Sequence, residues 1–155
     1  MTYRIPNRED IIQRVRAILL TRGGRVLFIK RVKPGREPYW VAPGGGVEDH
    51  DESLQQTLAR ELMEELGATA DVLRPAFVLN HEKAGKNLEE HFFLCRLNSL
   101  DLRLRSGPEF NNPERGLYLP DYVHLASDSL RQINIKTDEL RIWLLHNLPA
   151  LKRLA

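Results

Sequence analysis

A leucine repeat constrains the fold of this chain more than any other feature. Leucine recurs at every fourth position of one segment, at Leu54, Leu58, Leu62 and Leu66. This period is typical of one apolar face of an α-helix. Asp51 or Ser53 can cap the start of such a helix, and Gly67 can end it. We therefore expect an amphipathic helix from about Asp51 to Leu66, with its leucines packed on a core.

The segments around this helix have the β-branched and aromatic character of strands. Two β-rich runs flank a turn with Gly23 and Gly24, which indicates a hairpin. We expect strands at Val15–Leu20, Arg25–Lys30, Tyr39–Ala42, Ala70–Leu73, Ala76–Leu79, Glu90–Leu97 and Leu117–Leu125, a polar loop at Asn98–Pro113, and a closing helix at Thr137–Leu148. The glycine run Pro43–Gly46 is expected to break the third strand.

Strands mixed with two helices that do not alternate regularly favour an α+β or α/β/α sandwich. The chain has 155 residues, which is the size of one ordinary domain. It contains no internal repeat and no linker long enough to separate two domains. We therefore predict a single domain over residues 1–155.

The composition limits the class of function. A net charge of +2 is too small to favour a nucleic-acid-binding protein. The modest basic cluster between Arg22 and Arg36 is either solvated surface or a means of attracting a polyanionic small molecule. The single Cys95 fits a reducing compartment, and neither the start of the chain nor any other run has the apolar length of a leader or membrane span. We expect a cytoplasmic protein without membrane or nucleic-acid partners.

Three glutamates on the expected helix are candidates for metal binding. Glu61, Glu64 and Glu65 stand at positions i, i+3 and i+4, so they project from one surface. Like charges at these spacings destabilise an isolated helix, and a divalent cation would compensate them. Hard carboxylate oxygens suit Mg²⁺ or Mn²⁺. The competing interpretation is an acidic helix face that is merely solvated.

The spacing of the whole segment favours the metal site over that interpretation. Five residues separate Gly46 from Glu52, and seven more separate Glu52 from the run Arg60-Glu61-Leu62-Met63-Glu64-Glu65-Leu66-Gly67. This pattern matches the box of the Nudix hydrolases (the MutT-like enzymes), which reads G-x5-E-x7-R-E-U-x-E-E-x-G-U, where U is a bulky aliphatic residue. Residues 39–68 closely resemble that family, and the rest of the chain resembles it in outline.

The resemblance implies an α/β/α sandwich with a mixed β-sheet, in which the box forms a loop–helix–loop. It implies that Glu64 and Glu65 are the principal metal ligands, and that Glu61 binds metal or helps to deprotonate the attacking water. Arg60 matches the arginine that orients these glutamates, and Glu52 matches a glutamate that supports the loop and helix. A backbone carbonyl of Gly44 or Gly45 is implied as a further metal ligand.

Two positions depart from the family pattern. Ala68 stands where a bulky aliphatic residue is usual, which affects packing more than chemistry. Aligned on Pro43-Gly44-Gly45, the loop to Glu52 is one residue longer than in many members, and it lacks the glycine that precedes the box glutamate. The match through Gly46 and the identity of the glycine that faces the metal are therefore open.

The implied reaction is the Mg²⁺-dependent hydrolysis of a pyrophosphate bond, in a nucleoside diphosphate linked to another moiety or in a nucleoside triphosphate. The alternative is a catalytically silent Nudix-fold sensor or binding domain for a nucleotide metabolite. The resemblance also makes a homodimer possible. It leaves the substrate open, because residues 83–86 carry no proline or tyrosine of the kind that marks some subfamilies.

Residues outside the box are weaker candidates. Family members often recruit a further acidic residue as base, and the candidates here are Glu109, Glu114, Glu89 and Glu90. Trp40 and Tyr39 precede the box and are candidates for stacking on a nucleobase, although strand aromatics are more often part of a core. Cys95 is expected to be a buried, unreactive thiol.

Overall fold

The computed structural model describes residues 10–155, so the expectation about the first nine residues lies outside it. Eight strands of this part of the chain form one mixed sheet, in which β1–β6 and β3–β8 are the parallel pairs. The strands are β1 (Ile11–Thr21), β2 (Arg25–Val32), β3 (Tyr39–Val41), β4 (Gly44–Gly46), β5 (Ala68–Lys83), β6 (Lys86–Leu100), β7 (Leu117–His124) and β8 (Ile135–Lys136). The helices are α1 (Leu54–Leu66), α2 (Ser127–Arg131), α3 (Asp138–His146) and α4 (Leu148–Leu154), with single 3₁₀ turns at Leu102–Leu104, Pro108–Asn111 and Pro113–Arg115.

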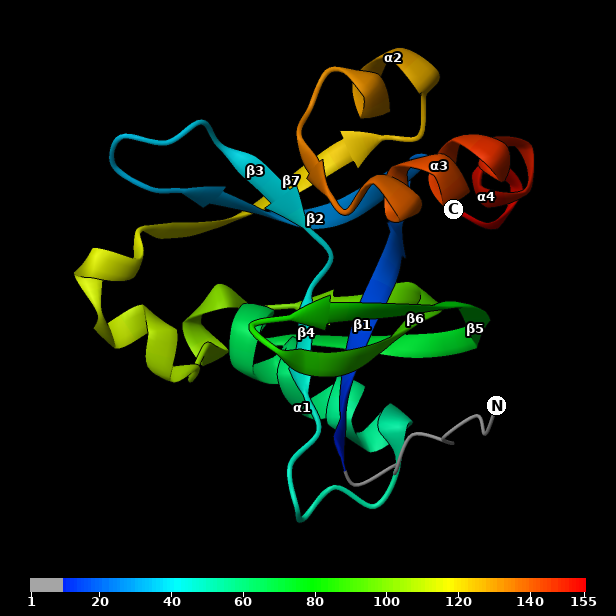
Figure 1. The fold of residues 1–155 in the computed structure, drawn as a ribbon. Helices are drawn as coiled ribbons and strands as arrows, with labels where there is room; N and C mark the ends of the chain where they lie inside the picture. The colour runs from blue at the N-terminus through cyan, green and yellow to red at the C-terminus, as the bar shows by residue number, and fades with distance from the viewer. Residues whose placement is uncertain (1–9) are drawn as a thin grey trace.

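Strands β1 and β2 diverge after a short paired stretch. The two strands pair only next to their hairpin, over Leu19–Thr21 and Arg25–Leu27. Farther from the hairpin, β1 pairs with β4 and β2 pairs with β3 instead. Figure 1 shows β1 running from the lower half of the sheet, with β4, β5 and β6, to the upper half, with β2, β3 and β7. The two halves of the sheet therefore diverge away from the hairpin.

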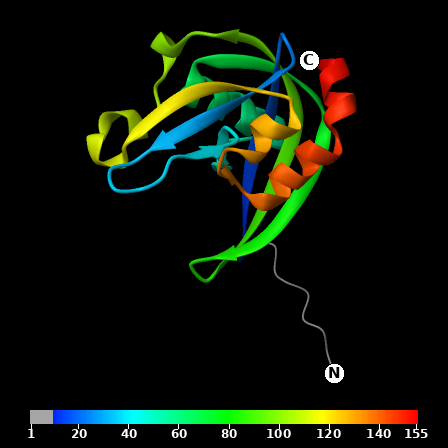
Figure 2. The ribbon, with the colours of Figure 1, turned by 90° about the horizontal axis from the view of Figure 1, so that it is seen from above.

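Helices cover both faces of this curled sheet. The leucines of α1 pack with the odd-numbered residues Val15, Ala17 and Leu19 of β1 in one apolar cluster. On the opposite face, Ile18 and Leu20 pack in a second cluster with α2, α3 and α4. Figure 2 shows α3 and α4 lying along the outside of the curve. The predicted α/β/α sandwich with a mixed sheet is confirmed.

Helix α1 ends at Leu66 as predicted and begins at Leu54, three residues after the expected start. Its first turn is capped by Ser53, whose Oγ accepts a hydrogen bond of 3.0 Å from the Gln56 N–H. It ends at Gly67, whose φ of 60° is the left-handed conformation that glycine adopts without strain. Of the leucine repeat, Leu58, Leu62 and Leu66 are buried, while Leu54 packs at the edge of the cluster.

Several expected boundaries were wrong. The third strand does end before the glycine run, at Val41, but Gly44–Gly46 is itself a strand, β4, which pairs with β1. The two candidates Ala70–Leu73 and Ala76–Leu79 are one strand, β5, with irregular register around Pro75. The expected closing helix corresponds to α3, and a further helix, α4, follows it that was not expected; Pro149 has no N–H to continue α3. Among the described residues, no helix has the length and apolarity needed to cross a bilayer.

Candidate functional site

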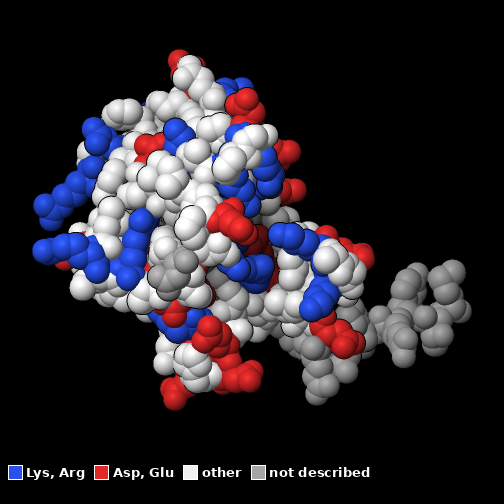
Figure 3. Space-filling model, turned by 90° about the vertical axis from the view of Figure 1, so that its left-hand side faces the viewer, with Lys and Arg blue, Asp and Glu red and all other residues white. Residues whose placement is uncertain are grey.

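A cavity of about 450 Å³ opens at the split of the sheet. That size is typical of a site for a nucleotide-sized ligand. The glutamates of α1 and the glycines of β4 form one end of it, and strands β1, β5 and β6 contribute one wall. Strands β2, β3 and β8 contribute the other wall. Figure 3 shows acidic side chains within a hollow of this face, with basic side chains on more than one side of it.

The glycines of β4 let two glutamates approach the backbone closely. A Cβ on Gly45 would lie 2.5 Å from the Glu61 carboxylate, so a larger residue there would displace this carboxylate from its position. The Gly44 N–H donates a hydrogen bond of 3.3 Å to Glu65 Oε1. Gly44 itself has a φ of 153° and packs against the backbone of Val15, where a side chain would clash. Both carboxylates therefore lie against the chain segment that the box motif predicted.

The carboxyl groups of Glu61 and Glu65 both have raised pKa values. Burial raises the pKa of Glu65 well above its ordinary value of 4.5, and the charges of Glu61 and Glu109 raise it further, while Arg16 opposes the shift. Burial is also the main cause of the raised pKa of Glu61. Carboxyls in this state favour either a shared proton or a bound cation.

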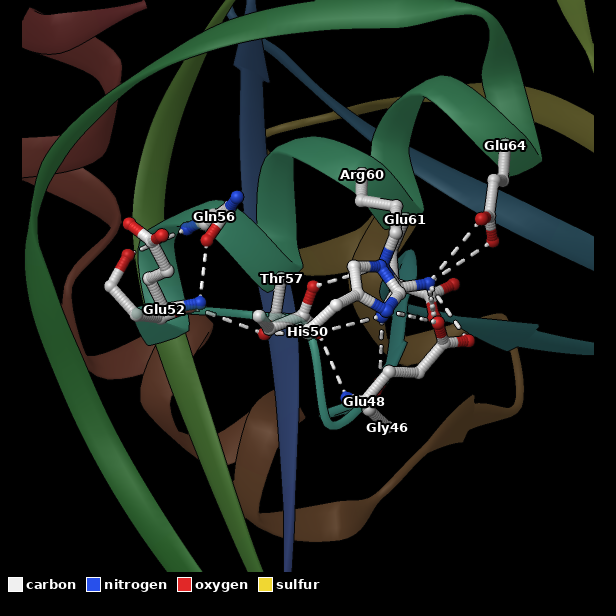
Figure 4. Close-up of polar contacts among 11 residues, drawn as sticks. Gly46, Glu48, His50, Glu52, Gln56, Thr57, Arg60, Glu61 and Glu64 are labelled. Carbon is white, nitrogen blue, oxygen red and sulfur yellow. Dashed lines mark hydrogen bonds and ion pairs between the residues drawn. The ribbon is translucent and has the colours of Figure 1, made fainter.

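Arg60 connects the box helix to the preceding loop. Its Nη1 donates to Glu61 Oε1 at 3.1 Å and to Glu64 Oε1 at 3.3 Å, and its Nη2 donates to the Gly46 carbonyl at 3.0 Å (Figure 4). The guanidinium thus holds two box glutamates and the end of β4 together. The resemblance implied that Arg60 orients these glutamates, and this role stays a prediction.

The Arg60 guanidinium is bonded on its other side by Asp51, which we expected only as a helix cap. Asp51 accepts from Arg60 Nη2 at 2.9 Å and from Arg60 Nε at 3.2 Å, and also from the Thr57 hydroxyl and the Glu48 N–H. The hydrogen bonds from Arg60 are the main reason that the pKa of Asp51 is strongly lowered. Glu52, the residue at the box spacing, is exposed, and its N–H bonds to Gln56. The carboxylate that contacts Arg60 therefore comes from the residue one position upstream of the box glutamate.

The three predicted metal ligands do not converge. Glu64 binds Arg60 and is not among the residues that line the cavity, whereas Glu61 and Glu65 are. Within residues 10–155, no cluster of three or more acidic, histidine or cysteine side chains encloses a metal position. The glutamate end of the cavity instead offers the Glu61 and Glu65 carboxylates beside the glycines of β4. This donor set fits Mg²⁺, which retains several waters and completes its shell with substrate phosphates.

The structure separates the candidate bases. Glu109 lines the cavity and acts electrostatically on Glu65. Glu90 also lines it, but it is buried and bonded to Arg16 at 3.0 Å. Glu114 is exposed and outside the cavity lining, while Glu89 bonds to Gln13 and His91. Glu109 is thus the candidate that combines access to the cavity with proximity to the box glutamates.

Trp40 and Tyr39 lie on opposite sides of β3. Trp40 packs on the cluster below α3, and its indole N–H donates to Asp121 at 2.8 Å. Trp40 is not among the cavity-lining residues, whereas Tyr39 is. Cys95 is fully buried, and burial raises the pKa of its thiol to about 12, as expected for an unreactive cysteine.

A family model for the NUDIX domain matches residues 11–127. The chain belongs to the Nudix family. No curated protein sequence matches it. Its fold is similar to the solution structure of the E. coli ORF135 protein, at 26% identity and a TM-score of 0.63, over 92% of this chain and 91% of that one.

Two further Nudix structures agree with this assignment. A MutT Nudix hydrolase from Burkholderia pseudomallei is 25% identical, with a TM-score of 0.62 over 86% of this chain and 95% of that one. A Nudix hydrolase from Nitrosomonas europaea is 17% identical, with a TM-score of 0.68 over 91% of this chain and 90% of that one, and supports the fold. The predicted Nudix family, fold and enzyme class, a hydrolase acting on acid anhydrides, are confirmed.

Proposed function

We propose that this Nudix hydrolase uses Mg²⁺ or Mn²⁺ to cleave a pyrophosphate bond, in a nucleoside diphosphate linked to another moiety or in a nucleoside triphosphate. The observation that carries the proposal is the placement of Glu61 and Glu65. Both carboxylates line a cavity of nucleotide size, lie against the glycines of β4, and have pKa values raised by burial.

Glu61, Glu65 and a carbonyl of Gly44 or Gly45 would hold the metal, and Glu64 is a further ligand if it leaves Arg60. A bound divalent ion would neutralise diphosphate charge and lower the pKa of a bound water. Arg60 and Asp51 keep the carboxylates in position. Glu109 is the proposed base, because it lines the cavity close to Glu65.

Cations on β1 suit the substrate diphosphate. Arg14 pairs with Gly46 across the strands, so it lies beside the glutamate end of the cavity. Its Nε is buried without a hydrogen-bond partner among the described residues. A phosphate oxygen would supply that partner, because guanidinium groups bind phosphate through charge-assisted hydrogen bonds. We place the enzyme in the cytoplasm, in keeping with its unpaired cysteine.

The test is hydrolysis of deoxynucleoside triphosphates, ADP-ribose, nucleotide sugars and dinucleoside polyphosphates with Mg²⁺, measured together with binding. We expect turnover of at least one compound, loss of turnover with EDTA, and a fall on the order of 10²-fold or more in Glu65→Gln. Glu82→Gln, which removes an exposed carboxylate from β5, is the matched control and should stay at the wild-type rate.

Two results would contradict the proposal. Binding of these nucleotides without hydrolysis of any would support the sensor. Wild-type turnover in Glu65→Gln would remove the box carboxylate from the reaction.

A further inference from the structure

The cavity wall formed by β2, β3 and β8 has cations but no carboxylate of its own. Four carboxylates line the whole cavity. Glu61 and Glu109 interact with Glu65, so these three lie at the glutamate end. The fourth, Glu90, pairs with Arg16 on the opposite wall. The positive charge of the β2–β3–β8 wall is therefore not compensated within the cavity.

Tyr39 lines this wall and has three cations near its ring: Lys136 also lines the cavity, whereas Arg36 and Lys33 belong to the loop between β2 and β3, outside the lining. Lys136 Nζ lies 4.7 Å from its ring centroid, Arg36 Cζ 5.6 Å, and Lys33 Nζ 5.8 Å. None of these three cations has an ion pair with a carboxylate of the described residues, at the 4.0 Å limit. Burial raises the pKa of Tyr39, but a hydrogen bond with Lys33 and the nearby cations outweigh it and lower the pKa. The environment of this hydroxyl therefore favours negative charge.

Two further residues of this wall, Thr137 and Arg31, add a hydrogen-bond donor and a fixed cation to the cations near Tyr39. Thr137 follows Lys136 and lines the cavity, and its Oγ1 is buried without a hydrogen-bond partner in the part of the chain that the structure describes. Arg31 is fixed, because its guanidinium donates to two backbone carbonyls and stacks on Tyr118 with Cζ 3.4 Å from the ring centroid. An anion at this wall would receive a free hydroxyl donor and lie in the field of an immobile cation.

We propose that Tyr39, Lys136 and Thr137 form a second anion subsite, which binds a phosphoryl group of the substrate that is not part of the scissile pyrophosphate. The inference rests on the proposed function for the reaction at Glu61 and Glu65. Lys136 pairs with Val41, three residues before Gly44. Because three residues of extended chain span at most about 10 Å, Val41 lies within about 10 Å of Gly44 at the glutamate end of the cavity. The preferred substrate is thus a nucleoside diphosphate derivative that carries an additional phosphomonoester.

The first test measures binding without divalent ions, in EDTA and about 0.1 M salt. Calorimetry compares adenosine 3′,5′-bisphosphate with adenosine 5′-monophosphate. We expect the bisphosphate to bind about tenfold or more tightly, since a charge-assisted contact is lost in the monophosphate. Lys136→Met and Tyr39→Phe should bring the ratio towards one. Lys152→Met, which removes an exposed lysine from α4, should leave the ratio unchanged. Equal wild-type affinities, or an unchanged ratio in both subsite variants, would overturn the subsite.

The second test measures turnover with Mg²⁺ on substrate pairs that differ by one phosphomonoester: coenzyme A against its 3′-dephospho form, and ADP-ribose 2′-phosphate against ADP-ribose. We expect kcat/KM to be about tenfold or more higher for the phosphorylated member of at least one pair, and Lys136→Met to remove the preference. Turnover without preference in both pairs would overturn the substrate class. If no compound is hydrolysed while the binding ratio is intact, the proposed function fails and the anion subsite stands.

Discussion

At the scale of single residues, the loop between β4 and α1 is one residue longer than in many family members, and the carboxylate that contacts Arg60 lies outside the box motif. Arg60 is held by Asp51, whose side chain is 1% exposed, while Glu52 at the motif position faces solvent. The carboxylate of Asp51 also accepts from Thr57 of α1 and from the backbone of Glu48. The loop, the helix and the arginine therefore meet at a residue outside the motif.

Replacing Asp51 should impair the enzyme more than replacing Glu52. Asp51→Asn weakens two charge-assisted hydrogen bonds to Arg60, and we expect activity to fall about 10- to 100-fold, as is typical when a group that supports metal ligands is lost. Glu52→Gln should retain wild-type activity, because its side chain is exposed. Steady-state kinetics with a Mg²⁺ titration will show whether the loss is in metal affinity, as a positioning role requires. A larger loss in Glu52→Gln than in Asp51→Asn would return the role to the motif glutamate.

At the scale of elements, α1 was predictable because its signals are local. The leucine period, the Ser53 cap and Gly67 all act within the helix itself, and the structure has each of them. β4 was not predictable in this way, since three glycines have no side chains to show a strand period. Its strand pairing is with β1, which lies about 30 residues earlier in the chain.

The same distinction explains the rest of the site. The β1–β2 hairpin and the box helix follow from neighbouring residues, as predicted. The inward position of Tyr39 and the outward position of Trp40 depend on the register of β3 with β2. Lys136 and Thr137 enter the cavity only because the two-residue strand β8 pairs with β3. A sequence pattern does not carry that pairing, so these residues were missed.

Substitutions on the buried face of α1 should lower the free energy of unfolding of the protein more than substitutions on its exposed face. Leu58→Ala removes a fully buried side chain between α1 and the sheet, and we expect the free energy of unfolding to fall by about 2–5 kcal/mol. Gln55→Ala, on the exposed face, should change it by less than about 0.5 kcal/mol. Chemical denaturation followed by circular dichroism compares the two. Equal effects would mean that α1 does not pack through its leucine repeat.

At the scale of the whole molecule, buried carboxylates link stability to pH and to metal. The folded pKa of Glu65 is raised above 4.5, so the folded state retains a proton that the unfolded chain has lost. This carboxyl therefore stabilises the metal-free fold at low pH, and the contribution is lost as the pH rises through the raised pKa.

In EDTA, the melting temperature of the wild type should fall as the pH rises above about 4.5, and Glu65→Gln should reduce this fall. At neutral pH, Mg²⁺ at 100 times its dissociation constant should stabilise the wild type by about 2.7 kcal/mol. Thermal melts of both proteins, with Glu82→Gln as the control, measure these effects. If Mg²⁺ raised the melting temperature of Glu65→Gln as much as that of the wild type, Glu65 would not be a ligand of the ion.

The divergence of β1 from β2 divides the work of this enzyme between two parts of its architecture. The carboxylates proposed to hold the metal stand with α1 and β4 on the side of β1, whereas the wall proposed to select the compound stands with β3 and β8 on the side of β2. A protein engineer can therefore vary Tyr39 or Lys136 to redirect selectivity without altering a single metal-binding side chain. Gene duplication offers evolution the same freedom, since new specificity can arise on one strand pair while the hydrolytic apparatus is inherited intact.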